Sequence, residues 1–373
     1  MSPEDLPLVH QPGSSLVAVG PSGERIVAEM MSGALALSRL DAKAEAALVP
    51  RFKIGEHEFC EPDYRQILLW AESLDMEPET VLERLTEAPR FSDPWSFEPW
   101  QKCNSTKFEN GRIVRLALNL ESLPIREFTW VEGLGIEALI FILPQDHDSE
   151  DSHFNLHPLP LPKLERLFCH FLGLDRLDLS SVPQLFHLGC SGCHLRELDL
   201  SAVPKLEFLS CDHNEISSLN VGAAPCLQYL ECRDNMLTEL DLTAVPNLKE
   251  LHCTGNQLTN LDLSSSFELG VLECSGNRLS ALDVRHCHRL RSLGCEDNQL
   301  TALALPCFSQ LTQLNCQNNE LRELNVSEQP FLEAIWCEHN SIEELKVFDL
   351  LNLADLKYDK GKTRVNQRID QDF

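Results

Sequence analysis

Leucine recurs at a fixed interval through the second half of the chain. Residues 227–268 hold two consecutive copies of one 21-residue frame, L-x-x-L-x-C-x-x-N-x-L-x-x-L-D-L-S/T-x-x-P-x, and the second copy has phenylalanine in the proline position. A short fixed period is typical of solenoids, in which one unit cannot bury its own leucines and stacks on its neighbours. The frame therefore predicts a repeat architecture for this part of the chain.

Nine regular units follow one another without a slip across residues 164–352. They begin at Leu164, Leu185, Leu206, Leu227, Leu248, Leu269, Leu290, Leu311 and Leu332. The frame weakens in residues 353–373, because Tyr358 stands in the cysteine position and Gly361 in the asparagine position. Terminal repeats are atypical and close the core, so we expect a C-terminal cap and tail there.

Each position of the frame has a structural use. The segment L-x-x-L-x-C predicts a short strand with leucine and cysteine pointing inward, and stacked units place these strands in a parallel sheet about 4.8 Å apart. The asparagine falls where the chain leaves the strand, and its amide can both donate to and accept from backbone groups in that turn. With 21 residues per unit, the convex side has no room for a full helix.

The LxxLxCxxNxLxxLDLS frames of these units resemble the leucine-rich repeat family, and within it the 21-residue bacterial class with a cysteine ladder, of the internalin-J type. The resemblance covers about half of the chain. It implies an α/β-type, right-handed repeat solenoid with a parallel sheet on its concave face. It implies little about function, because one fold serves many activities.

The first 163 residues do not follow the regular frame. For residues 1–110 we predict a small, mainly α-helical domain, with two short strands in residues 15–30, helices at 34–48 and 64–74 and a further helix from Pro78. Residues 95–100 (WSFEPW) are predicted to be a connector. Residues 111–163 are interpreted as degenerate first repeats that form an N-terminal cap. The acidic stretch at 145–153 within them is interpreted as a solvated loop, with docking of a basic partner as the alternative.

The chain carries a large negative charge. Its net charge is −27, from 58 acidic and 31 basic residues. Such a surface favours solubility, disfavours binding to nucleic acid and anionic membranes, and is compatible with a basic protein partner. We find no signal-peptide pattern and no apolar run of about 18 residues that would span a membrane. The expectation is a soluble cytoplasmic protein, with secretion by a signal-less route as the alternative.

The cysteines are better explained by packing than by chemistry. Nine of the 15 lie one period apart, at Cys169, Cys190, Cys211, Cys232, Cys253, Cys274, Cys295, Cys316 and Cys337. Stacked strands hold equivalent Cβ atoms nearly 5 Å apart, whereas a disulfide needs about 3.5–4.5 Å and converging Cβ vectors. We therefore expect a ladder of buried free thiols, which fits a reducing compartment.

The remaining candidates for chemistry are weak. Cys190 and Cys193 form a C-x-x-C motif, a metal or redox signal, but Cys190 belongs to the ladder and no second pair accompanies it. The trio at 286–288 (His-Cys-His) is interpreted as exposed polar residues. Five histidines on the concave face occupy different columns, so we predict no metal site there, and a pH-sensitive partner contact is an open alternative. These are His170, His187, His213, His252 and His339.

We therefore expect neither a metal nor a cofactor, and no enzymatic activity. The N-terminal residues Cys60, Cys103, His10 and His57 show no spacing typical of a catalytic site.

Recognition can vary only at outward-facing strand positions, which are the third, fifth, seventh and eighth of each unit. At the N-terminal end these positions combine aromatic side chains with histidine and arginine, which is typical of protein interfaces. The predicted partner-binding residues are Arg166, Phe168, His170, Phe171, His187, Phe208, His213, Tyr229, Arg233 and Trp336. The alternative is that residues 1–110 fold back and cover these aromatic side chains.

The leading hypothesis is a non-catalytic scaffold that binds a protein on its concave face, as a recognition or regulatory subunit of a bacterial multi-component effector or defence system. The alternative is an effector or enzyme whose N-terminal domain carries the activity while the repeats select the substrate. A surface adhesin is a third hypothesis, but the absence of a signal pattern and the many free thiols argue against it.

Overall fold

In the computed structural model, strands recur with the period that the leucines predict. The structure describes residues 15–19, 25–29, 51–86, 106–109, 112–120, 130, 134–142, 154, 156, 159–174, 176–307 and 310–366. The predicted helix at 34–48, the connector at 95–100 and the acidic loop at 145–153 lie outside the described residues.

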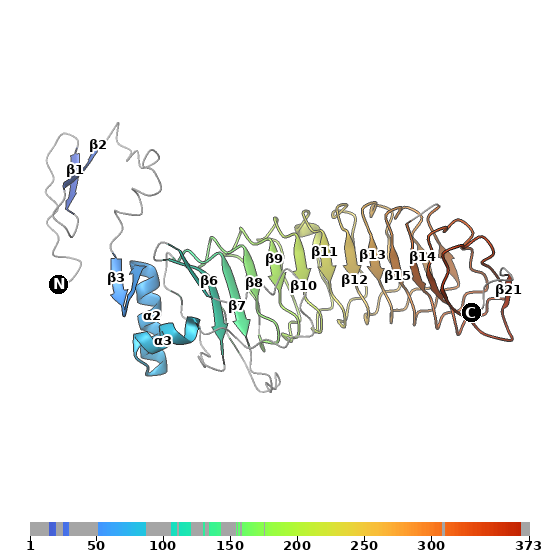
Figure 1. The fold of residues 1–373 in the computed structure, drawn as a ribbon, viewed down its shortest axis with the longest axis horizontal. Coiled ribbons are helices and arrows are strands. Elements are labelled where there is room, and N and C mark those ends of the chain that lie inside the picture. Colours follow the sequence, from blue (N-terminus) through green and yellow to red (C-terminus); the bar gives the residue numbers. More distant parts are fainter. Residues whose placement is uncertain are drawn as a thin grey trace.

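One 13-stranded sheet runs the length of the array (Figure 1). Its parallel strands are β6 (Arg112–Asn119), β7 (Ala138–Ile142), β8 (Arg166–Phe168), β9 (His187–Gly189), β10 (Phe208–Ser210), β11 (Tyr229–Glu231), β12 (Glu250–His252), β13 (Val271–Glu273), β15 (Ser292–Gly294), β17 (Gln313–Asn315), β18 (Ala334–Trp336) and β20 (Asp355–Lys357). From β8 onward each strand pairs with the next at an offset of 21 residues, as Phe208 pairs with Tyr229 and Ala334 with Asp355. The predicted period and parallel sheet are therefore confirmed.

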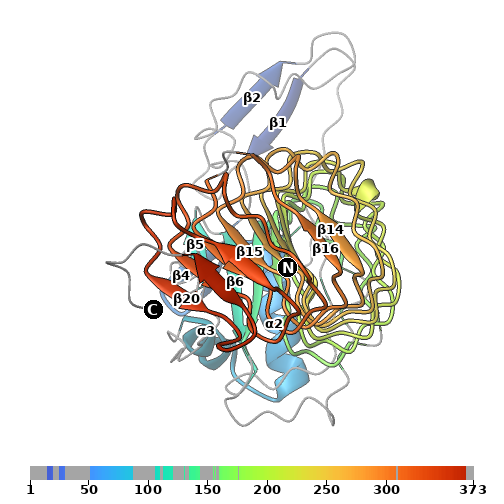
Figure 2. The ribbon, with the colours of Figure 1, turned by 90° about the vertical axis from the view of Figure 1, so that its right-hand side faces the viewer.

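The convex side is extended rather than helical. Short strands pair there in two places, β14 (Ala281–Asp283) with β16 (Ala302–Ala304) and β19 (Glu344–Lys346) with β21 (Arg364–Asn366). Figure 2, a view along the array, places β14 and β16 on the wall opposite β15. The described convex segments otherwise contain one 3-10 turn, Val221–Ala223. The molecule is a β-solenoid of about 11 turns, which corrects the α/β description implied by the resemblance.

The inward columns form one continuous core. Each first-position leucine of the nine regular units is fully buried, and the ladder cysteines are at most 2% exposed. The same cluster continues from Ile54 near the beginning of the described chain to Leu356 in the last coil. Replacing one of these leucines by alanine typically costs about 2–5 kcal/mol, because the cavity cannot collapse fully.

The N-terminal region mixes strands and helices. Strands β1 (Ser15–Val19) and β2 (Arg25–Glu29) are antiparallel, which confirms the two predicted strands. A hairpin of β3 (Arg51–Ile54) and β4 (His57–Cys60) precedes α2 (Glu61–Leu74) and α3 (Pro78–Thr86), and β5 (Lys107–Glu109) pairs antiparallel with β6. Both helices predicted in residues 51–86 are confirmed. A mainly α-helical domain is not shown, since strands are as prominent as helices in the described part.

Helices α2 and α3 close the N-terminal end of the core (Figure 1). Trp70 of α2 is 2% exposed, and its ring centroid lies 6.1 Å from that of Trp130 in an edge-on contact. Asp63 is fully buried, and its Oδ1 accepts a hydrogen bond from the backbone N–H of Ile113 at the start of β6 (3.0 Å). A solenoid end needs such a cover, because its last coil would otherwise expose leucine.

Residues 353–366 form one further coil at the other end. Strand β20 continues the sheet, and the Thr363 hydroxyl donates to the carbonyl of Ile342 (2.8 Å). Asp359, two residues before the Gly361 that stands in the asparagine position, accepts a hydrogen bond from the backbone N–H of Asn340 (3.1 Å). Among the described residues, no helix has both the length and the apolar composition to span a membrane.

Candidate functional site

The eighth position of every regular unit has a left-handed backbone. The φ angles at this position are 59° at Phe171, 65° at Gly192, 52° at His213, 49° at Asp234, 68° at Gly255, 61° at Gly276, 54° at Asp297, 53° at Asn318 and 58° at His339. Glycine adopts this conformation freely, and asparagine, aspartate and histidine are enriched in it. The backbone therefore explains most of a column that the sequence presented as a recognition surface.

Phe171 is the exception in this column. A bulky side chain in the left-handed region is an outlier that is found most often at functional sites. The Phe171 side chain is 44% exposed, and its ring lies against Gly192 of the next coil, where a Cβ atom would overlap it. Gly192 of the next coil thus leaves room for the exposed ring of Phe171, whose own backbone conformation is strained.

Phe168 and Phe208 are less exposed than predicted. Phe168 is 7% exposed and packs with Ala117 and Ile140 on the outer side of β6 and β7. Phe208 is 8% exposed, and its ring meets the His187 ring edge-on at 5.7 Å between centroids and the Tyr229 ring at 6.3 Å. These rings support the surface, and they present little area of their own.

Two histidines between these aromatic rings have defined environments. The Nδ1 of His170 accepts a hydrogen bond from the backbone N–H of Ser191 (3.2 Å), and its ring stacks on Phe168 at 6.2 Å between centroids. Burial, with a smaller contribution from the Arg166 charge, lowers the pKa of His187 to about 4. His187 is therefore neutral at physiological pH and packs as an aromatic ring.

The structure brings six of the ten predicted residues into one surface, which we call the aromatic surface: Phe168, His170, Phe171, His187, Phe208 and Tyr229. The guanidinium of Arg166 turns to the neighbouring Phe186 ring, 4.6 Å from its centroid. Two further predicted residues face carboxylates: Arg233 Nη1 lies 2.7 Å from Asp212 Oδ2, and His213 Nδ1 lies 3.2 Å from Asp234 Oδ2.

Trp336 lies apart from this surface. It belongs to β18, eight strands from β8 in the sheet, which corresponds to about 38 Å at the usual strand spacing. Its indole N–H donates to Asp355 Oδ2 (2.7 Å), and Lys357 Nζ lies 5.3 Å from its ring centroid. The structure does not bring Trp336 together with the other predicted residues.

The C-x-x-C pair is part of the core. Cys190 and Cys193 are both fully buried. The Cys193 thiol donates to the carbonyl of Cys169 (2.8 Å), as the asparagine amides do one coil later. Burial raises the pKa of the Cys190 thiol well above its usual value. In the described part of the chain, no group of three His, Cys, Asp or Glu side chains is placed to hold a metal ion.

Comparison with solved structures finds several repeat proteins. The functional domain of InlJ from Listeria monocytogenes, which includes a cysteine ladder, is 30% identical over 53% of this chain and 49% of that one, with a TM-score of 0.48. A leucine-rich repeat protein of Leptospira interrogans is 22% identical, with 62% and 68% covered and a TM-score of 0.48. YopM from Yersinia enterocolitica is 23% identical, with 65% and 66% covered and a TM-score of 0.43.

This chain spans about half the length of the InlJ domain that it matches. No protein-family model and no curated protein sequence matches it.

The asparagine column decides the class of repeat. Each buried asparagine joins two coils: Asn256 Oδ1 accepts from the N–H of Leu237 (3.0 Å), and its Nδ2 donates to the carbonyls of Cys232 (2.9 Å) and Cys253 (3.1 Å). The same set of bonds recurs at Asn235, Asn277, Asn298 and Asn319. Beside it runs the buried cysteine column on a parallel leucine sheet. The array is a leucine-rich repeat solenoid with a cysteine ladder.

The convex aspartates of this leucine-rich repeat solenoid also have a local role. Their carboxylates accept the backbone N–H two residues later, as Asp199 does from Ser201 (2.9 Å) and Asp241 from Thr243 (2.9 Å). The backbone bond from Ser201 is the main cause that lowers the pKa of Asp199, and the hydrogen bond from the Thr243 hydroxyl, followed by that from its backbone N–H, lowers the pKa of Asp241. At Asp283 the Arg285 side chain is the main cause that lowers the pKa, to about 2.

A further surface is not among the predicted sites, because it lies at the second position of the frame and not at the outward-facing strand positions. In the leucine-rich repeat array this position follows the first leucine, at the edge where strands begin. Gly270 occupies it between Lys249 and Arg291, one coil to either side. The sequence pattern that indicates this surface is a glycine with a cationic residue 21 positions before it and another 21 positions after it.

Proposed function

We propose that this chain is a non-catalytic, protein-binding scaffold that contacts its partner through the aromatic surface on the concave face. The binding role is consistent with a leucine-rich repeat solenoid, whose stacked strands offer a long, rigid face. The observation that carries the proposal is Phe171: an exposed aromatic ring held in a left-handed backbone that other units fill with glycine, aspartate, asparagine or histidine.

The energetics of Phe171 support a binding role over a packing role. A left-handed backbone costs a non-glycine residue about 1 kcal/mol or more, and an exposed ring recovers little of this from burial. Rigid aromatic side chains that are half exposed are the usual anchors of protein interfaces. The Phe171 ring lies beside the His170 ring (6.4 Å between centroids), which in turn stacks on the packed ring of Phe168.

Substituting Phe171 by asparagine tests the proposal. Asparagine tolerates the left-handed backbone, so we expect the free energy of unfolding of the full chain to be unchanged or raised by about 1 kcal/mol. We expect co-purification of the partner from the native host, detected by mass spectrometry with the tagged chain as bait, to be lost.

The matched control is Phe267→Asn. Phe267 is 53% exposed and lies outside the sheet strands, so the substitution removes a similar apolar area from another part of the surface. We expect this variant to capture the same partner as the unmodified chain. Capture that survives Phe171→Asn, or that is lost only with Phe267→Asn, would show that the aromatic surface is not the binding site.

A further inference from the structure

Gly270 is a glycine that the backbone does not require. Its φ is not in the left-handed region, unlike those of Gly192, Gly255 and Gly276. A Cβ atom at Gly270 would find its nearest neighbours at 3.5 Å (Arg291 Nη2) and 3.6 Å (Lys249 carbonyl oxygen), which are ordinary contacts. What the glycine provides is therefore space and not conformational freedom.

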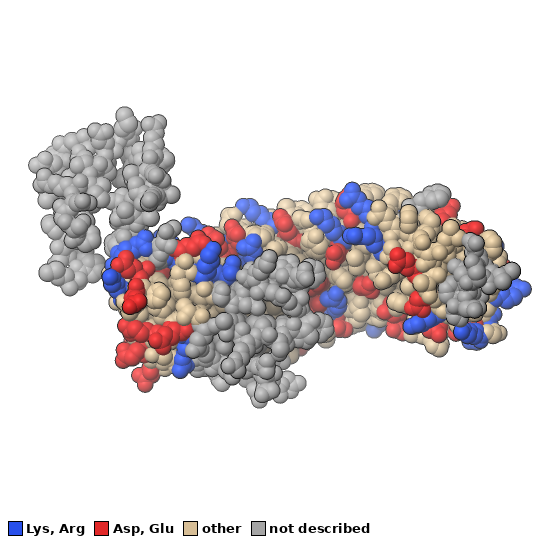
Figure 3. All heavy atoms as spheres, in the orientation of Figure 1, with Lys and Arg blue, Asp and Glu red and all other residues tan. Residues whose placement is uncertain are grey.

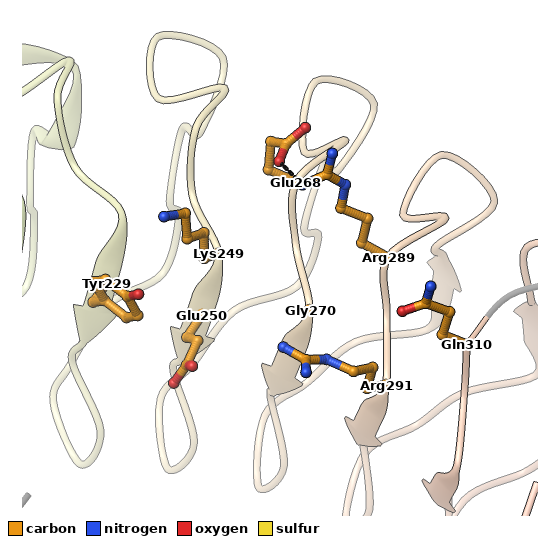
Figure 4. A pocket seen from close by; sticks show the side chains of 8 residues that line it. All are labelled: Tyr229, Lys249, Glu250, Glu268, Gly270, Arg289, Arg291 and Gln310. Carbon is orange, nitrogen blue, oxygen red and sulfur yellow. Dashed lines mark hydrogen bonds and ion pairs between the residues drawn. The ribbon is translucent and has the colours of Figure 1, made fainter. Parts of the chain in front are cut away.

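The space is a hollow of about 480 Å³ on the edge of the sheet where β11, β12, β13 and β15 begin. Figure 4 shows Lys249 and Arg291 on the coils to either side of Gly270, with the Arg291 guanidinium reaching toward the Gly270 strand. Tyr229 lies at one end of the hollow, and Arg289 and Gln310 lie at the other.

Three cations and the carboxylates of Glu250 and Glu268 line the hollow, and two of the cations have no ion-pair partner among the described residues. Glu268 pairs with Arg289, and Glu250 Oε2 lies 3.7 Å from His252 Nε2. Lys249 Nζ donates to the neutral amide of Gln228 (2.7 Å) and lies 5.9 Å from the Tyr229 ring centroid. The exposed Arg291 side chain forms no ion pair with an acidic side chain of the described residues. Lys249 and Arg291, on the coils that flank Gly270, thus have no ion-pair partner among the described residues.

This positive hollow is a local exception in a chain of net charge −27. Figure 3 shows Lys and Arg atoms gathered at the upper edge of the array, beside the region of β12 and β13 in Figure 1. At physiological ionic strength the screening length is about 8 Å, so a bound group responds mainly to the charges beside it. Two strand spacings separate the coils of Lys249 and Arg291 by about 10 Å. The Arg291 guanidinium lies over Gly270, and the Lys249 ammonium lies towards Gln228 and Tyr229.

We propose that the Gly270 hollow binds an acidic segment of a protein partner. One carboxylate enters beside the Arg291 guanidinium over Gly270 and pairs with it, Lys249 adds a second positive charge, and an adjacent planar side chain packs on the Tyr229 ring. Arginine binds carboxylates through two parallel hydrogen bonds, which gives such a contact its direction. A single carboxylate contacts the hollow alone, whereas a nucleic acid would bring a row of phosphates against the rest of a chain of net charge −27, which electrostatic repulsion opposes.

This site is chemically distinct from the aromatic surface, and its test does not depend on Phe171. The probe is a fluorescein-labelled peptide of alternating glutamate and tyrosine, titrated with the full chain and followed by fluorescence anisotropy. We expect binding that weakens with added salt. We expect Arg291→Gln and Lys249→Gln each to raise the Kd about fivefold, which corresponds to a partly exposed charge pair. Gly270→Leu, which fills the hollow, should raise the Kd at least as much.

Two controls separate the proposal from its alternatives. Arg278 is exposed and lies past the strand end, outside the hollow, so Arg278→Gln removes the same charge and should change the Kd less than about twofold. Phe171→Asn should leave peptide binding unchanged even if it abolishes partner capture. Circular dichroism melting curves of the variants, all at exposed or edge positions, verify that they fold.

The proposal is overturned if the unmodified chain does not bind the peptide, or if Arg278→Gln weakens binding as much as Arg291→Gln. It is also overturned if a labelled single-stranded oligonucleotide of equal charge binds more tightly than the peptide and depends on the same residues. That result would assign the hollow to phosphate recognition.

Discussion

At the scale of single residues, the buried asparagines carry more of the architecture than their small size suggests. Asn256 is 7% exposed, and its one amide group bonds to backbone groups of its own coil and of the preceding coil. Leucine packing holds neighbouring coils together. The hydrogen bonds of the asparagine side chains satisfy backbone groups of the turns that are buried from water. Removing the side chain leaves the buried N–H of Leu237 unsatisfied and takes one hydrogen bond from each of the carbonyls of Cys232 and Cys253.

We expect Asn256→Ala to lower the free energy of unfolding by about 3 kcal/mol, since buried groups left without a hydrogen-bond partner cost about 1–3 kcal/mol each. The measurement is urea denaturation followed by circular dichroism. The exposed Thr259 of the same coil serves as the control, because Thr259→Ala should change stability by less than about 0.5 kcal/mol. Equal effects of the two substitutions would mean that the asparagine bonds are not stabilising.

Individual residues also show where sequence reasoning succeeded and where it could not. The inward leucine, cysteine and asparagine positions were predictable, because periodic burial fixes which residue type fits each. The left-handed eighth position was not, because a side-chain pattern does not report φ. The low exposure of Phe168 depends on Ala117 and Ile140, which come from strands outside the regular frame. No periodic rule places those strands.

At the scale of elements, the strands are short, and the pairing between neighbouring strands fixes how the coils stack. Each regular strand is three residues long. The ladder cysteine follows it directly in the sequence and is buried on the core side of the sheet. The ladder thiols are buried, and burial raises the pKa of, for example, Cys211 and Cys253 well above the usual value. Such thiols are poor nucleophiles, since the reactive form is the thiolate.

The accessibility of the thiols gives an ordered prediction. Cys226 and Cys307 are exposed, and a hydrogen bond to the Glu328 side chain raises the pKa of Cys307. Among the cysteines that the structure describes, iodoacetamide should label Cys226 first and Cys307 more slowly in the native chain at neutral pH. The ladder cysteines should react at least about a hundredfold more slowly than Cys226, because labelling requires local opening. Peptide mass spectrometry over time measures all of these rates, and rapid labelling of Cys253 without denaturant would contradict the packing described.

At the scale of the whole molecule, the core must be closed at its ends. The helical hairpin of α2 and α3 closes one end, and its contact with β6 includes the buried carboxyl group of Asp63. Both helices were predictable from their apolar spacing. Their role as a lid on the first strand was not, because nothing in the local pattern states which surface an apolar helix face meets.

Asp63 makes the stability of this end depend on pH. Burial raises the pKa of its carboxyl group in the folded chain, although the hydrogen bond from Ile113 acts in the opposite direction. A raised folded pKa means that folding favours the protonated form, so the benefit is present below the unfolded pKa and is lost as pH rises through the folded pKa.

Asp63→Asn keeps the acceptor for Ile113 and removes the charge. We expect it to equal or exceed the unmodified chain in stability at pH 7, with a difference that shrinks as pH falls towards 4. Asp63→Leu removes the acceptor and should destabilise this end by about 1–3 kcal/mol. Hydrogen exchange of the β6 amides measures both effects, and a difference that grows on acidification would contradict the assignment.

Because neighbouring strands pair at a uniform offset of 21 residues, distances along the array come in equal steps of one coil. Phe171 follows β8, and Gly270 precedes β13, five strands along the sheet. The spacing between the two surfaces is therefore an integral number of coils, in steps of about 4.8 Å. Loss or duplication of one complete coil would move the surfaces relative to each other by one step, while every inward side chain kept its direction. Descendants of such a chain could adjust the length of a bound partner without redesigning either surface.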